Sequence, residues 1–258
     1  MISSRTNPRI QSSLASNSGS VEKSHAMAPP FRIGSRGNLP GVLETVLTVG
    51  VLGFVGFRLA SAAGHSFTAA GRSTTAPLVR GIRWRHVWPA PLVLIAVLVV
   101  ATLLLQVPGL DWGWWTALGG AGNPVTGTTD QTAGTPLEWL VPLVFLTMLL
   151  PAIPLFALAE ERTFRRGSDQ WSWPRRVRRT LEFGLAHALI GIPIGVALAL
   201  SCGGAYFMAV YLRAYRVRHD PREAVLDSAR AHAVYNVIIV VLVLITVVLI
   251  ATGAASEP

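Results

Sequence analysis

The chain has 258 residues, of which 51% are hydrophobic and only 14% carry a charged side chain. A soluble globular domain carries roughly 25% charged residues. The deficit argues against a soluble domain and indicates a polytopic membrane protein, with its apolar segments forming a single helical bundle.

The net charge of +9 comes almost entirely from arginine, because Lys23 is the only lysine. The arginines lie between apolar runs rather than in a basic patch on a soluble module. They therefore indicate cytosolic loops and contact with anionic membrane lipids, and we expect no nucleic-acid partner. Cys202 is the only cysteine, which excludes an intrachain disulfide and any cysteine-based zinc or redox motif.

The first forty residues differ in composition from the rest. Residues 1–40 are rich in Ser, Asn, Pro and Gly and show no hydrophobic periodicity, which predicts a disordered basic tail. They do not have the pattern of a secretory signal peptide, since the first apolar run starts after position 40.

The remaining chain contains apolar runs long enough to cross a bilayer, for which a helix needs about 20 residues. Four runs meet this length, and they cover 42–62, 88–107, 137–159 and 224–251. The stretch 180–215 is long enough for two short spans. Its glycines and proline at Gly191, Pro193 and Gly195 predict a turn, which gives helices near 180–194 and 197–216. The sequence thus predicts an all-α transmembrane bundle of about six spans.

The arginine distribution predicts the orientation of this bundle. Three loops are rich in arginine, and they cover 63–87, 160–179 and 213–223, whereas 108–136 has no Lys or Arg. The positive-inside rule places the three basic loops in the cytosol and 108–136 outside. The tail conflicts with this assignment, because it would lie outside yet carries Arg32 and Arg36. Either the tail is an exception, or the first apolar run does not fully cross.

An acidic pair, Glu160 and Glu161, ends the third predicted span on its cytosolic side. Carboxylates at a membrane boundary are candidates for function, and their partners are sought on neighbouring spans. Arg165 follows Glu161 by four residues, so it can pair with one carboxylate and leave the second free.

Candidate partners lie in the cytosolic half of the later spans. Counted from helix starts near 180 and 224, His187 lies about 10 Å into the membrane, His232 about 12 Å and Asn236 about 18 Å. His232 and Asn236 are four residues apart and share one helix face.

These residues form three short motifs in a fixed order. EExxxR runs from Glu160 to Arg165, FxxxH from Phe183 to His187, and HxxxN from His232 to Asn236. Their order and separation resemble the CPBP (CAAX protease and bacteriocin-processing, or Abi) family of intramembrane endopeptidases, to which the type II CAAX prenyl endopeptidases belong. The resemblance covers about 137–252, and it implies a four-helix catalytic core there. The segment 41–136 would then supply two N-terminal spans and an extracytoplasmic loop. The chain departs from the usual pattern at Arg162, a position that is often apolar, and at the extra Arg166.

The resemblance implies an endopeptidase in a bacterial plasma membrane. It would hydrolyse a peptide bond of a membrane-associated protein or peptide near the cytosolic face. Glu160 and His187 would activate a water, His232 and Asn236 would stabilise the oxyanion, and Glu161 and Arg165 would support the site. The residue types agree independently, because peptide hydrolysis needs a base and hydrogen-bond donors aimed at the developing oxyanion.

A catalytic zinc is the alternative use of the same side chains. Glu160, His187 and His232 are suitable Zn²⁺ ligands that would leave one position open for water, although the chain has no HExxH motif. The CPBP family is often labelled as metalloproteases, while a metal-independent glutamate mechanism has also been argued for it. The sequence leaves both mechanisms open.

Two other functions remain compatible with the sequence. A non-proteolytic scaffold or bacteriocin-immunity type protein would keep the same fold, but it would tolerate loss of the motif residues. A transporter with a Glu/His proton relay would predict paired broken helices, and the chain has one interrupted segment, 191–195, with no counterpart. Taken singly, the acidic pair is also compatible with a surface ion pair, and the histidines with helix packing.

Overall fold

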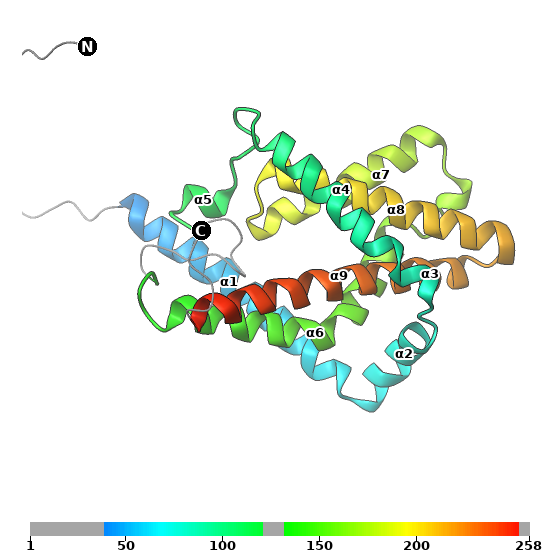
Figure 1. The fold of residues 1–258 in the computed structure, drawn as a ribbon, viewed down its shortest axis with the longest axis horizontal. Helices are drawn as coiled ribbons and strands as arrows, with labels where there is room; N and C mark the ends of the chain where they lie inside the picture. Colours follow the sequence, from blue (N-terminus) through cyan, green and yellow to red (C-terminus); the bar gives the residue numbers. More distant parts are fainter. Residues whose placement is uncertain (1–38, 121–131, 253–258) are drawn as a thin grey trace, which may run out of the picture. The chain divides into compact units, whose positions relative to one another are not determined.

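A computed structural model describes residues 39–120 and 132–252, and the regular elements of these residues are helical. Figure 1 shows their course along the chain. In chain order they are α1 (Leu39–Ser66), α2 (Ala69–Arg80), α3 (Trp84–Val87), α4 (Pro89–Leu104), α5 (Trp114–Ala117), α6 (Leu137–Phe164), η1 (Ser168–Gln170), α7 (Trp173–Ala186), η2 (His187–Ile190), α8 (Ile194–Arg218) and α9 (Pro221–Ala251). The predicted tail, 1–40, lies outside the described residues except for its last two.

Four stretches of the described chain are long and apolar enough to cross a membrane, which marks the protein as an integral membrane protein. They cover Trp84–Leu104, Leu137–Gln170, Ile194–Arg218 and Pro221–Ala251. Large apolar side chains on the outer faces of these helices are exposed rather than packed. On α4, for example, Leu92, Ile95 and Leu103 are each more than half exposed. Such a surface is expected where lipid tails replace water around the bundle.

Two of the six predicted spans are not among these four. The first, 42–62, falls within α1, where several side chains lie outside the described residues. The other, 180–194, differs from the observed structure, because the helix there is α7, which starts at Trp173 and ends at Ala186. Its 14 residues span about 21 Å and include four arginines, so it is too short and too polar to cross the hydrocarbon core.

The turn predicted between 191 and 195 is present. The chain leaves η2 at Gly191, whose φ of 90° lies in the left-handed region that favours glycine. Pro193 then precedes the first residue of α8. The reversal brings α7 back along α8, and these two helices pack closely against each other.

The long helix α9 is the central element of the bundle. It packs against α6 and α8 and also contacts α4 (Figure 1). One cluster of buried side chains joins α6, α8 and α9, and a second joins α4, α7, α8 and α9. The predicted boundary at residue 136 therefore separates α4 from helices against which it packs. Sequence alone did not reveal this, because α4 is apolar on all faces and gives no sign of its partner.

Replacing Gly184 tests the close approach of α7 to α8. A Cβ at this position would overlap the Ser201 hydroxyl and the Ala197 carbonyl, so the two backbones would have to separate. We expect Gly184→Ala to lower the free energy of unfolding by about 1–3 kcal/mol, measured by thermal unfolding in detergent. Gly64→Ala is the control, because a Cβ there meets no atom within 4 Å. Equal unfolding midpoints for the two variants would contradict the close packing of α7 against α8 at Gly184.

Candidate active site

The two acidic residues of α6 point to different environments. The helix does not stop at Glu160 as predicted but continues to Phe164. Neighbouring residues on a helix are rotated by about 100° from each other, so the two carboxylates meet different neighbours. Glu161 is fully buried, whereas Glu160 is partly exposed and lines a cavity.

The buried Glu161 carboxylate contacts three side chains. Its Oε1 lies 2.9 Å from Nδ1 of His232 and 3.4 Å from a guanidinium nitrogen of Arg165. Its Oε2 lies 2.5 Å from the Ser228 hydroxyl, which also lies 2.9 Å from the Phe207 carbonyl. A buried carboxylate is tolerated only when it is paired and hydrogen-bonded. These contacts meet that requirement and connect α6 to α9.

Arg165 is completely buried at the C-terminal end of α6. Its guanidinium lies 4.0 Å from the centroid of the Phe183 ring, a cation–π arrangement, and it donates a hydrogen bond of 3.3 Å to the Gly204 carbonyl. A Cβ at Gly204 would lie only 2.8 Å from the Phe183 ring. Arg165 therefore joins α6 to α7 and α8, and glycine at position 204 leaves room for this contact.

Each of the two histidines is held by one ring nitrogen. His232 stacks on the Phe207 ring at 4.3 Å between centroids, and its Nδ1 faces Glu161. Nδ1 of His187 lies 2.9 Å from the Phe183 carbonyl. Because a carbonyl and a carboxylate oxygen accept hydrogen bonds, each Nδ1 carries the proton. In the neutral rings, Nε2 is therefore the unprotonated nitrogen.

A cavity of about 530 Å³ is lined by the four predicted catalytic residues Glu160, His187, His232 and Asn236. Nε2 of His232 lies 3.6 Å from Oε2 of Glu160, a separation too long for a direct hydrogen bond. That buried Glu160 oxygen has no hydrogen-bond partner among the described residues. The cavity is thus lined by a carboxylate oxygen without a hydrogen bond, by two imidazole rings and by an amide.

Sequence reasoning missed several residues of this site. Ser228 lies four residues before His232, so the face that carries His232 and Asn236 extends back by one turn, and this spacing is the signal that could have found it. Arg58 is a lone arginine in the apolar run of α1, and it lines the cavity without an ion-pair partner among the described residues. Tyr235 also lines the cavity, and its buried hydroxyl has no hydrogen-bond partner in the described part of the chain. No sequence signal marked Tyr235.

The three suggested zinc ligands do not form a metal site. Within residues 39–120 and 132–252, no three His, Cys, Asp or Glu side chains come together in a way that could hold one metal ion. The geometry of Glu160, His187 and His232 therefore does not fit the predicted Zn²⁺ set, and we derive no catalytic step through a metal.

No protein-family model, curated protein or solved structure matches this chain.

Replacing Arg165 tests the buried pair that holds this site together. Arg165→Met leaves Glu161 without its only guanidinium partner, and breaking a buried ion pair costs about 3–5 kcal/mol. We therefore expect the free energy of unfolding of the detergent-solubilised protein to fall by about this amount, measured by thermal unfolding. Arg166→Met is the matched control, because Arg166 is exposed. If both variants unfold at the same temperature, the Arg165–Glu161 contact does not stabilise the fold.

Proposed function

We propose that the protein is an intramembrane endopeptidase that uses Glu160 to activate water for hydrolysis of a peptide bond. The observation that carries the proposal is a buried Glu160 oxygen that accepts no hydrogen bond from the described residues, in a cavity that also contains His187, His232 and Asn236. A carboxylate kept free of protein donors can accept a proton from a bound water. The resemblance of the three motifs to the CPBP family supports the same conclusion.

The reaction begins with a water held between Glu160 and Nε2 of His187. As the water oxygen attacks the peptide carbonyl carbon, one of its protons passes to the Glu160 carboxylate. The tetrahedral intermediate then collapses, the C–N bond breaks, and Glu160 returns the proton to the leaving amine nitrogen. One water is consumed, and one carboxyl and one amino terminus are formed.

His232 and Asn236 stabilise the negative charge on the carbonyl oxygen. The Asn236 side chain makes no hydrogen bond within the described residues, so its amide N–H is available as a donor. His232 already donates Nδ1–H to Glu161, so it donates from Nε2 only when the ring is doubly protonated, and the charged ring then faces both glutamates. The adjacent Glu161 carboxylate balances that positive charge, which gives Glu161 a role distinct from that of Glu160.

The substrate is a membrane-associated protein or peptide, since the cavity walls come from α1, α6, α7, η2, α8 and α9 and are mainly apolar. The arginine-rich ends of these helices favour a cytosolic position for the site, in a bacterial plasma membrane. Arg58 in the cavity wall supplies a positive charge that an acidic group of the substrate could meet.

Replacing Glu160 by glutamine tests the proposed base. The amide keeps the shape of the side chain but cannot accept the proton, so we expect cleavage to fall by about 10²–10⁴-fold. The assay uses purified protein in liposomes with prenylated and acylated membrane peptides, and products are identified by mass spectrometry. Glu182→Gln is the control, because Glu182 pairs with Arg178 and Arg179 outside the cavity. Unchanged cleavage by Glu160→Gln would overturn the mechanism. The absence of cleavage of every peptide by wild-type protein would count against a protease and favour a scaffold.

Replacing Asn236 by alanine tests the oxyanion donor. Loss of one donor to the oxyanion lowers kcat by about 10²–10³-fold while leaving KM nearly unchanged. We expect this pattern in the same assay, and we expect cleavage to persist when a chelator is present. A raised KM with normal kcat would instead assign Asn236 to substrate binding, and loss of activity with chelator would show that a metal is required.

A further inference from the structure

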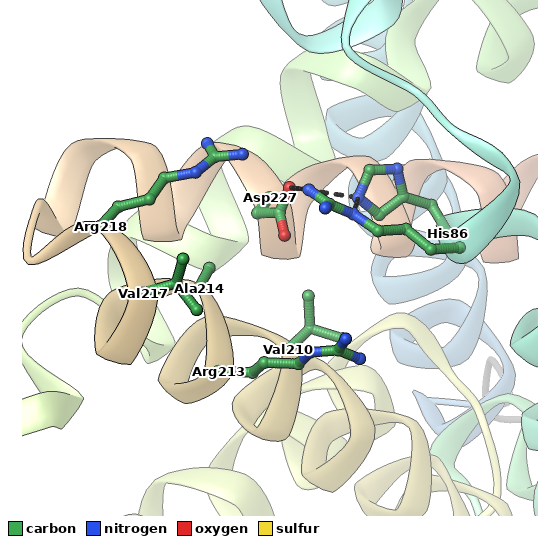
Figure 2. Close-up of a pocket in the computed structure, with 8 residues that line it drawn as sticks. His86, Val210, Arg213, Ala214, Val217, Arg218 and Asp227 are labelled. Carbon is green, nitrogen blue, oxygen red and sulfur yellow. Dashed lines mark hydrogen bonds and ion pairs between the residues drawn. The ribbon is translucent and has the colours of Figure 1, made fainter.

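A second cavity, of about 310 Å³, lies where α3, α8 and α9 meet. Figure 2 shows the charged side chains Arg213, Arg218 and Asp227 around this opening together with His86, whose neighbour Arg85 also lines it. None of these residues contributes to the cavity that contains Glu160. The second cavity therefore has no part in the proposed hydrolysis.

The charges around this cavity do not cancel. Among the described residues, Asp227 is the only acidic one that lines it, and Asp227 is already engaged by Arg85 at 2.8 Å, His86 at 3.2 Å and Arg230 at 3.4 Å. Arg213 is exposed and has no ion-pair partner among the described residues. The lining therefore has an excess of positive charge and is suited to an anion.

Arg218 adds to this excess at the rim of the cavity. It pairs with Glu223 at 2.6 Å, yet both side chains remain well exposed. Exposed ion pairs of this kind are worth roughly 0–1 kcal/mol, so a strong anion can compete for the guanidinium.

The same cavity also has an apolar wall, formed by Val210, Ala214 and Val217 of α8 (Figure 2). Val217 is 75% exposed, although it lies between charged residues. A small inorganic anion would use the arginines but would gain nothing from this wall. A ligand with an anionic group attached to an apolar chain would use both.

Two exposed tryptophans place the cavity at the edge of the bilayer. Trp84 and Trp88 flank Arg85 and His86, and their exposed fractions are 73% and 52%. Tryptophan side chains gather at the lipid headgroup level of membrane proteins. The C-terminal end of α8, which carries Arg213 and Arg218, lines the cavity at the same level.

We propose that this cavity binds the phosphate of an anionic phospholipid from the surrounding leaflet. Arg213, Arg218 and Arg85 contact the phosphate, and the start of an acyl chain lies along Val210 and Val217. Basic pockets between transmembrane helices on the cytosolic side are suited to anionic headgroups. The lipid bridges α3, α8 and α9.

Arg213 and Arg216 provide a matched pair of variants for the test. Both are exposed arginines on α8, but only Arg213 lines the cavity. Binding of phosphatidylglycerol and of phosphatidylcholine with identical acyl chains is measured by native mass spectrometry of the full-length protein in detergent. We expect phosphatidylglycerol to bind at least fivefold tighter. Arg213→Gln should weaken the binding of phosphatidylglycerol about fivefold, which corresponds to the free energy that one arginine contributes near an anionic surface. Arg216→Gln should change this binding less than twofold.

Val217→Glu is a second variant, which places a carboxylate at the mouth of the cavity without removing an arginine. It should weaken binding of phosphatidylglycerol by at least as much as Arg213→Gln. Equal effects of Arg213→Gln and Arg216→Gln would overturn the proposal, since they would indicate general surface charge. Equal binding of the two lipids would overturn it as well. Inorganic phosphate that displaces phosphatidylglycerol at low millimolar concentration would show a free-anion site instead. These readouts do not depend on peptide cleavage.

Discussion

The burial of one carboxylate, that of Glu161, is the constraint on which the site depends. An uncompensated carboxylate inside a low-dielectric bundle is strongly destabilising. Arg165, His232 and Ser228 supply the compensation, and together they belong to two different helices. The helices α6 and α9 can therefore meet in one register only, in which these groups face Glu161.

That register also determines what Glu160 can do. Arg165 and Ser228 are used by Glu161, and the Nδ1 proton of His232 is directed to it as well. Glu160 faces the cavity, where one of its oxygens has no hydrogen-bond partner among the described residues and lies 3.6 Å from Nε2 of His232. One helix turn thus contains a structural carboxylate and a carboxylate left free for chemistry, and the proposed mechanism needs both.

Helix α9 shows how the bundle separates polar from apolar functions. The side chains of Asp227, Ser228, Arg230 and His232 are all buried in its first half, and Asn236 follows one turn later. After Asn236 the helix is almost entirely apolar. Both cavities use the polar half, since Asp227 lines the cavity beside α3 and His232 lines the cavity that contains Glu160. Five residues, or about 8 Å along the helix, separate these two side chains, so the two cavities lie near each other on α9.

The sequence by itself determined that the protein is helical and lies in a membrane, because hydropathy and length are local properties. It also predicted the turn at Gly191 and the shared face of His232 and Asn236, which follow from backbone preference and helix periodicity. Only the tertiary structure decided which of the two glutamates is buried, that Ser228 joins the site and that α4 packs on α8 and α9. Helices that are apolar on every side have no intrinsic inward face. Their rotation and partners are selected by which polar groups must find each other, and in this protein that choice is made by Glu161 and the side chains that surround it.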